Sequence, residues 1–289
     1  MNDIKEQQDK PENLKLLAAQ RVAYERAKYV FGLQVLFTVV FAVALNFIRL
    51  LPKDVIIDFL PFILTLSFLV SIVDLLVFTK YISSMRTKAA KVQELFDCSV
   101  YGMGWNSYNS GSKPEGNFIH ENFKRYVPDP SRKIENWYDI DLNGLSQEKA
   151  ILLCQETNLW YDGQLRQKFK NLSLYCLIGL AIISFVISLA TKQDAGMIMM
   201  YMVAPLLPAI VMTVKIYQEN DKSIISSSEL KSAVKTLRGS QIQPTMEELR
   251  KIQDKIFCSR KDSSLVPEWF YRKKRTNLEE GMKINASGE

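Results

Sequence analysis

The chain has 289 residues with a formal net charge of +6, and 47% of them are hydrophobic and 24% charged. These averages suit a soluble protein of one or two domains. A single histidine and four cysteines without a CxxC pair provide no metal-ligand spacing, so composition argues against a metal centre. The distribution of charge along the chain is more informative than its average.

Four segments of about 20 residues are almost free of charge. Residues 29–48, 172–191 and 195–214 contain no charged side chain, and residues 59–78 contain only Asp74. A helix of that length reaches ~30 Å, the thickness of a bilayer core. A buried soluble helix is the alternative for any one segment. Four segments in closely spaced pairs predict two transmembrane hairpins, with spans at about 29–49, 59–79, 172–191 and 195–215.

Lysine and arginine are distributed unevenly between the segments that the spans separate. The short gaps between paired spans contain two and one of them, against six before span one, thirteen between residues 80 and 170, and fifteen from Lys215 onward. By the positive-inside rule, both termini and the central region face the cytosol. We therefore expect a multi-pass membrane protein divided into a helix at 1–28, a hairpin at 29–79, a central region at 80–171, a second hairpin at 172–217 and a tail at 218–289.

Helical periodicity dominates the parts outside the spans. The fold class we expect is mainly α: a four-helix transmembrane bundle of two hairpins with a small, mostly helical cytosolic domain. Residues 1–12 are polar, which predicts disorder, and a helix from Pro11 runs into span one. An apolar stripe from Tyr81 to Phe96 extends span two beyond the membrane. Ser146 is a predicted N-cap, Thr245 with Glu248 a capping box, and the last twenty residues are predicted to be mobile apart from the cluster Trp269-Phe270-Tyr271.

Catalytic motifs are lacking. His120 is the single histidine, and a lone histidine on a short helix is usually structural or solvated. Gly111-Ser112-Lys113 lacks the frame of a phosphate-binding loop, and no GxSxG is found. We therefore expect neither an enzyme nor a bound metal or cofactor.

Aromatic and basic residues of the central region form the candidate ligand site. A nucleotide needs a flat π surface for its base and cations for its phosphates. Packing of the small core, or of the membrane interface, is the alternative role for the tryptophans. The predicted ligand-binding residues are Trp105, Arg132, Lys133, Trp137, Tyr138, Trp160 and Arg166.

Two further sets of residues are candidates for membrane functions. Polar or helix-breaking residues within the spans are candidates for gating or for lining a pore, although Asp74 also fits the interface and prolines are tolerated in membrane helices. An aromatic residue followed by cations suits an anionic lipid surface, with a solvated tail as the alternative. The first set is Asn46, Asp74, Pro205 and Pro208; the second is Trp269, Arg272, Lys273, Lys274 and Arg275.

Several stretches of the chain, taken in order, match the pattern of a known family. They begin with 16–21, Tyr24, Ala27-Lys28 and 88–98, include Trp105-Asn106 and Lys113-Pro114, and are most specific at Asn136-Trp137-Tyr138, 154–158, Trp160-Tyr161-Asp162 and Leu165-Arg166. Together they resemble the SMODS-associating four-transmembrane family of pore-forming effectors. Two departures, Leu145-Ser146 in place of Leu-Pro and Glu156 in place of an arginine, bear on ligand contact rather than on the fold.

The resemblance implies a role in bacterial anti-phage defence and abortive infection, beside a nucleotidyltransferase that makes cyclic oligonucleotides. The expected partners are the lipid bilayer, a cyclic oligonucleotide and further copies of the chain, because four helices leave no wide lumen; no DNA or RNA polymer is expected. A small transporter or constitutive channel remains an alternative, with Asp74 and the two prolines as its polar site. A membrane-anchored scaffold without a pore is the other.

Overall fold

The computed structural model describes residues 2–40, 53–130, 132–190, 195–198, 203–240 and 242–287, and within these ranges the regular structure is entirely helical. The mainly-α fold class is thus confirmed. In chain order the helices are α1 (Ile4–Gln8), α2 (Pro11–Val35), η1 (Leu36–Val40), α4 (Lys53–Val73), η3 (Asp74–Phe78), α5 (Thr79–Tyr101), α6 (Ser107–Ser110), α7 (Gly116–Lys124), α8 (Gln147–Ala190), α9 (Ala195–Ile198), α10 (Ala204–Gly239), α11 (Met246–Asp262) and α12 (Glu268–Ser287).

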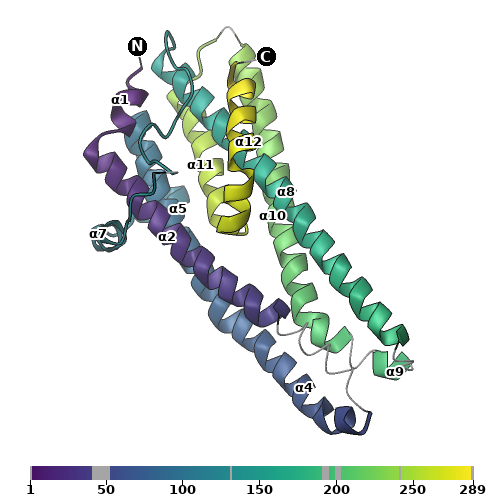
Figure 1. Ribbon diagram of the computed structural model, residues 1–289. Coiled ribbons are helices and arrows are strands. Elements are labelled where there is room, and N and C mark those ends of the chain that lie inside the picture. The colour runs from purple at the N-terminus through teal and green to yellow at the C-terminus, as the bar shows by residue number, and fades with distance from the viewer. Residues whose placement is uncertain are drawn as a thin grey trace.

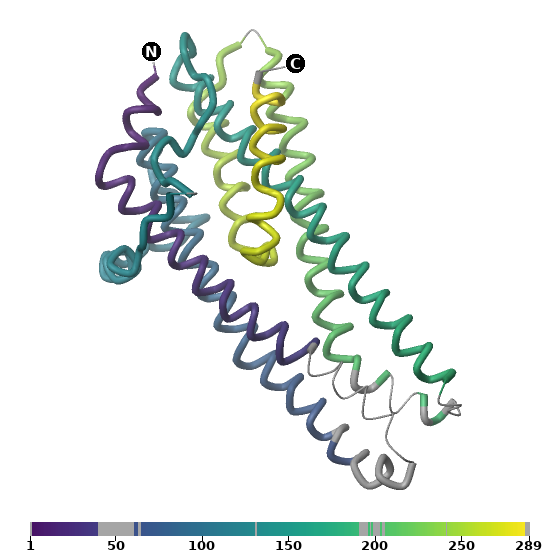
Figure 2. The backbone as a smooth tube through the Cα atoms, in the orientation of Figure 1, coloured from purple at the N-terminus to yellow at the C-terminus, as the bar shows by residue number. Residues whose placement is uncertain are grey.

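Two long helical pairs form the frame of the molecule. Helix α2 runs down beside α5, and α8 runs down beside α10 (Figure 1). Helix α10 also contacts α4 and η1, so the two pairs meet at their lower ends. The lower ends form a rod, and both chain ends lie at the opposite end of the molecule (Figure 2). We call that opposite end the head: α1, α6, α7, α11, α12, the loop 125–146 and the upper ends of the long helices.

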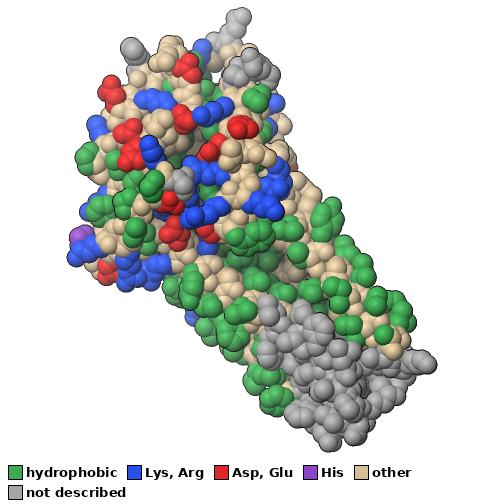
Figure 3. Space-filling model, in the orientation of Figure 1, with side chains coloured by type: hydrophobic (Ala, Val, Ile, Leu, Met, Phe, Trp, Pro, Cys, Tyr) green, Lys and Arg blue, Asp and Glu red, His purple; other side chains and the backbone are tan. Residues whose placement is uncertain are grey.

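The rod and the head differ in surface chemistry. Charged side chains gather on the head, whereas hydrophobic side chains cover the described surface of the rod (Figure 3). Among the described residues, two helices are long and apolar enough to cross a bilayer: the continuous run Thr65–Tyr101, which comprises the end of α4, η3 and α5, and helix α8 (Gln147–Ala190). Only 11% of each apolar window is buried. A core helix of a soluble protein would be mostly buried, so this exposure fits lipid. Tyr29, Tyr81 and Tyr175 are exposed where the apolar surface ends, as in an aromatic belt.

The N-terminal segment is ordered, so the predicted disorder of residues 1–12 is wrong. Ile4 is fully buried in the main hydrophobic core of the head. Gln8 is also buried, and its Oε1 accepts a hydrogen bond of 2.8 Å from the backbone N–H of Tyr138. A polar segment is held here by one apolar anchor and by hydrogen bonds to a distant loop, which local composition does not reveal.

The C-terminal segment is helical as far as Ser287, so the mobility predicted for the residues after the cluster Trp269-Phe270-Tyr271 is also wrong. Helix α12 packs along α8. Phe270 and Leu278 are buried, and Met282 packs against the core. These residues are eight and four positions apart, so they lie on one face of the helix and place an apolar stripe on α8. The many charges between them hide the stripe from a composition-based prediction.

Several local predictions are confirmed. Thr245 and Glu248 form a capping box at the start of α11. Ser146 Oγ accepts from the backbone N–H of Lys149 at 3.4 Å, at the start of α8. On α5, the part of the stripe from Met85 to Phe96 is buried, whereas Tyr81, at the end of the stripe next to the rod, is exposed. Capping residues therefore located the starts of α8 and α11, and sequence periodicity located the inward face of α5.

Candidate functional site

A cavity of about 700 Å³ opens in the head between α2, the loop 132–139, α8, α11 and α12. Small-molecule sites in proteins usually measure about 300–1,000 Å³. Its walls come from segments up to 260 residues apart in the chain. The cavity therefore exists only after the N-terminal helix, the central loop and the C-terminal helices have packed together.

Positive charge is in excess around the cavity. Among the described residues, eight Lys or Arg and five Asp or Glu side chains line it. This surplus favours an anionic occupant. The cations are Arg21, Lys28, Arg132, Lys133, Arg166, Arg260, Arg275 and Lys283; the acids are Glu25, Glu135, Asp139, Asp162 and Glu279.

Helix α2 presents one face to the cavity. Gln20, Arg21, Tyr24 and Lys28 lie on it at spacings of three and four residues. Gln20 is buried, and its Oε1 has no hydrogen-bond partner among the described residues. Burial raises the pKa of Tyr24 to about 12, although Arg260 and Arg166 oppose the shift, so the hydroxyl stays protonated at neutral pH. The face therefore offers an amide acceptor, a phenol donor and two cations to a ligand.

A cation–carboxylate cluster joins α2 and α12 at one wall. Lys28 Nζ lies 2.9 Å from Glu268 Oε2, and Arg132 pairs with the same carboxylate. Both cations also lie over the ring of Tyr271, each 5.2 Å from its centroid. Burial alone would raise the pKa of Glu268, but Lys28 and Arg132 outweigh that effect and lower it. An anionic ligand would therefore compete with Glu268 for Lys28 and Arg132, the cations that hold this wall together.

The segment 263–267 between α11 and α12 forms the membrane-proximal side of the cavity. Arg86 of α5 donates to the carbonyl oxygen of Ser263 at 2.7 Å, and Arg166 of α8 donates to that of Ser264 at 2.8 Å. Arg166 also donates to Asp162 Oδ2 at 2.6 Å and to Asn220 Oδ1 of α10 at 3.2 Å. Two buried arginines thus tie this segment to three helices that continue into the rod.

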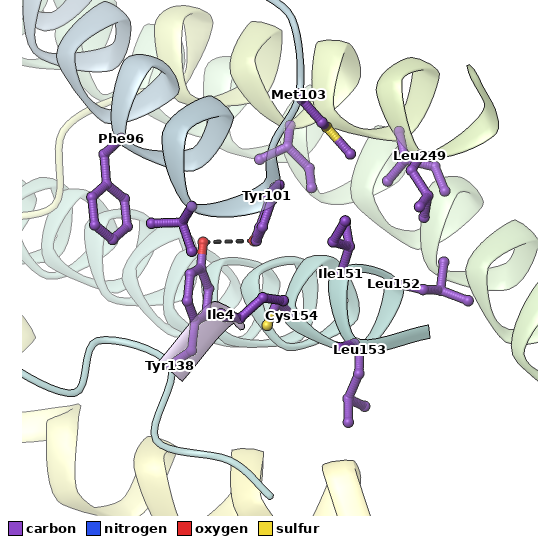
Figure 4. Close-up of a cluster of buried hydrophobic side chains, with 14 of the residues drawn as sticks. Ile4, Phe96, Tyr101, Met103, Tyr138, Ile151, Leu152, Leu153, Cys154 and Leu249 are labelled. Atoms are coloured by element: carbon purple, nitrogen blue, oxygen red, sulfur yellow. Dashed lines mark hydrogen bonds between the residues drawn. The ribbon is translucent and has the colours of Figure 1, made fainter. Parts of the chain in front are cut away.

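A buried polar network lies behind the cavity. Asp97 of α5 is fully buried and pairs with Arg260, one of the cations of the cavity. Gln253 Nε2 donates to Asp97 Oδ2 at 2.9 Å, and the hydroxyl of Tyr138 donates to Oδ1 at 2.7 Å. Tyr101 donates to that hydroxyl at 2.6 Å (Figure 4). Arg260 therefore connects the cavity to α5 through a carboxylate that water does not reach.

The same network continues along α5 to Glu94. Its carboxylate pairs with Arg250 and accepts from Gln253 Nε2 at 2.9 Å. Burial, and then the charge of Asp97, raise the pKa of Glu94 against the opposing effect of Arg250. Two carboxylates one turn apart are thus held inside the head by two arginines of α11.

The structure brings together four of the seven predicted ligand-binding residues. Trp137, Arg132, Lys133 and Arg166 line the cavity. Tyr138 lies in the core, where its ring stacks on Phe96 with centroids 6.3 Å apart.

The other two lie outside the lining of the cavity. Trp160 packs on the hydrophobic cluster of α8 and α12, and its ring is next to Gly281. Trp105 donates from Nε1 to the carbonyl oxygen of Gly111 at 2.8 Å and packs on the edge of the core. Their positions match the packing role that the sequence left open for tryptophan.

The candidate membrane residues are dispersed. Asp74 begins η3 and accepts from Gln34 Nε2 of α2 at 2.5 Å, so it links α2 to η3. Pro205 lies in the first turn of α10 and Pro208 in its interior, where it is buried. Asn46 lies outside the described residues.

The aromatic and basic group of the tail lies on the first turns of α12. Trp269 and Lys273 are exposed, and Lys274 is partly buried. Arg272 pairs with Glu268 at 3.3 Å and with Asp129 at 3.5 Å. Arg275, by contrast, lines the cavity beside Glu279.

Sequence reasoning did not assign five of the eight cations that line the cavity to a ligand site, and it placed one of these five, Arg275, in the lipid-contacting tail. Arg21 and Lys28 share a helical face with Tyr24. This spacing is visible in the sequence, but it is equally typical of a helix face that packs against the rest of the protein. Arg260 and Lys283 carry no local signal, because they reach the cavity only through the fold. Within the described ranges, no group of three or more His, Cys, Asp or Glu side chains is placed to hold a metal ion.

Comparison with known proteins adds two findings. The sequence model of the SMODS-associating 4TM effector domain matches residues 2–287. A probable CBASS effector molecule from Bacillus cereus (strain VD146) is 26% identical over 194 residues, which cover 64% of this chain and 63% of that relative. The chain thus spans less than two thirds of the length of that relative. No solved structure matches.

Proposed function

The chain belongs to the SMODS-associating 4TM effector family, and from this premise we propose that it permeabilises the bacterial inner membrane when a cyclic oligonucleotide occupies the head cavity. The similarity to a probable CBASS effector supports a role in anti-phage defence. The observation that carries the proposal is the cavity itself: a surplus of cations beside aromatic rings, in a head whose helices continue into the apolar rod.

The cavity has the chemistry that a small cyclic nucleotide requires. Phosphate oxygens would meet Arg21, Lys28 and Lys133, and bases would stack on flat rings such as Tyr24 and Trp137. Lys133 is exposed and has no acidic partner among the described residues, so binding phosphate there breaks no existing ion pair. Arg166 and Arg260 are already paired with Asp162 and Asp97 and hold the walls in place.

Transmission to the membrane would run through the segment 263–267. Arg86 and Arg166 hold its carbonyl oxygens and also contact Glu219 and Asn220 of α10. A ligand that shifts this segment therefore pulls on α5, α8 and α10 together, and each of these helices runs on toward the rod. The ligand drives opening only to the extent that it binds the open state more tightly.

A pore would require several copies of the chain, because a bundle of four helices leaves no wide lumen. A shift from mostly closed to mostly open takes about 5.5 kcal/mol of differential binding. Charge-assisted phosphate contacts of about 1.5–3 kcal/mol each, repeated in every protomer, are sufficient. The charge distribution of the sequence supports a topology with both termini and the head in the cytosol.

The test is dye release from liposomes. Purified protein is reconstituted with a self-quenched dye inside the vesicles, and a panel of cyclic di- and trinucleotides is added on the side where protease digestion locates the head. Two variants probe the cavity, Lys133→Gln and Tyr24→Phe, because neither removes a described ion pair. Lys149→Gln, an exposed cation at the start of α8 that does not line the cavity, is the matched control.

Release by one nucleotide, retained in Lys149→Gln and weakened at least tenfold in Lys133→Gln, is the expected result. Dye release without nucleotide would indicate that assembly of the protomers, and not occupation of the cavity, controls opening. Absence of release with every nucleotide, in vesicles where protease protection shows correct insertion, would contradict the pore and favour a scaffold or transporter.

A further inference from the structure

The first turn of α12 lies where the membrane surface is expected. The ring of Phe270 packs on Phe169 of α8, with centroids 5.5 Å apart. Phe169 precedes by three residues the uncharged stretch of α8 that begins at Leu172. Tyr175, within that stretch, is 66% exposed. The start of α12 is therefore level with the boundary between the head and the apolar rod, as Figure 1 also shows.

Trp269 projects from this turn into solvent. Its side chain is 60% exposed, although its ring is fixed at one edge against Phe270, with centroids 5.7 Å apart and planes at 88°. Trp is highly buried on average in globular proteins. An exposed indole at the edge of an apolar surface matches the position of tryptophan in membrane interfaces, where its apolar ring and its N–H donor are both accommodated.

Cations accompany Trp269 on the same side of the helix. Lys273 lies one turn further along and is exposed, and it has no acidic partner among the described residues. Arg272 is exposed and shares its charge between Glu268 and Asp129. Lys168 on α8 is likewise exposed and, in the described part of the chain, unpaired. Lys and Arg side chains near an anionic membrane surface are attracted to its headgroups.

We propose that Trp269, Arg272 and Lys273 form an anchor that binds anionic phospholipid headgroups and holds the base of α12 on the bilayer. The same turn carries Glu268, which pairs with Lys28 and Arg132 in the cavity wall. Lipid contact at the anchor therefore sets the position of that wall. The inference requires that the rod spans a bilayer, but it requires neither a nucleotide ligand nor a pore.

Tryptophan quenching in nanodiscs tests the anchor. The full chain is placed in discs whose lipids carry bromine near the glycerol end of the acyl chain, with either phosphatidylglycerol or phosphatidylcholine headgroups. Trp269→Phe removes the reporter and keeps an aromatic ring on Phe270; Trp105→Phe removes a tryptophan of the head and is its control. Lys273→Gln tests the charge, with Lys255→Gln, an exposed cation on α11, as the matched variant.

We expect a lipid-quenched component of emission in the unmodified chain and in Trp105→Phe that is lost in Trp269→Phe. In phosphatidylglycerol discs, Lys273→Gln should weaken this component and Lys255→Gln should leave it unchanged. Equal quenching with and without Trp269 would overturn the anchor. Equal quenching in both lipids, insensitive to Lys273, would overturn the selection for anionic headgroups. Neither outcome depends on the dye-release experiment, because no nucleotide is present.

Discussion

The pair of Asp97 and Arg260 gives the sharpest test of how the head is held together. Asp97 is fully buried, and Arg260 both pairs with it and lines the cavity. Arg260→Met keeps most of the side-chain volume and leaves the carboxylate buried without its cation. Removing one partner of a buried pair costs about 3–5 kcal/mol. Tyr138 and Gln253 still donate to Asp97, so we expect the free energy of unfolding to fall by an amount near the lower end of this range, about 3 kcal/mol.

The reciprocal variant should be milder. Asp97→Asn leaves Arg260 without its carboxylate, but water in the cavity can hydrogen-bond to the guanidinium. We therefore expect the free energy of unfolding to fall by about 1–3 kcal/mol. The double variant leaves no uncompensated charge. Its cost should therefore be smaller than the sum of the single costs by about 2 kcal/mol, within the usual range for residues in contact.

Denaturant unfolding in detergent micelles, followed by tryptophan emission, measures these free energies in a double-mutant cycle. Arg250→Met at the neighbouring pair with Glu94 serves as a comparison, since it breaks a second buried ion pair of α11. If the two single effects add within about 0.5 kcal/mol, Asp97 and Arg260 are not coupled, and the view of Arg260 as the link between cavity and α5 is wrong.

Three further predictions concern single residues. Gly281→Ala should destabilise the head by about 1–3 kcal/mol, because an added Cβ would lie 2.7 Å from Cη2 of Trp160; Gly163→Ala, with open space around it, should gain about 0.5–1 kcal/mol in the same unfolding assay. The fold favours ionised Glu268, so thermal stability should fall as pH drops from 4.5 through the lowered pKa of this carboxylate. Glu268→Gln should lose less stability than the unmodified chain over this pH range, and the same pH dependence in both proteins would contradict the assignment. Thr245→Ala should cost about 1 kcal/mol through loss of the capping box at α11, and no change in denaturation midpoint would refute that role.

Much of the secondary structure was predictable because its causes are local. Charge-free stretches of about 20 residues marked the long helices, and the stripe on α5 marked its buried face. Ser146, Thr245 and Glu248 marked helix starts through hydrogen bonds between residues three apart. The two errors, at residues 1–12 and at the C-terminus, have a shared cause. Both segments are polar on average and are ordered by a few apolar contacts to partners far away in sequence.

The candidate site divides in the same way. The sequence by itself determined that cations and aromatic rings gather outside the apolar segments, and it included Trp137, Arg132 and Lys133 among the candidates. It could not separate Tyr138 from Trp137, because neighbours in an irregular loop face opposite ways only once the core has formed. Tertiary structure alone decided that α2 and α11 bring further cations to the same cavity. Contacts across 100 to 260 residues depend on how the two hairpins and α12 pack, and no local spacing encodes that packing.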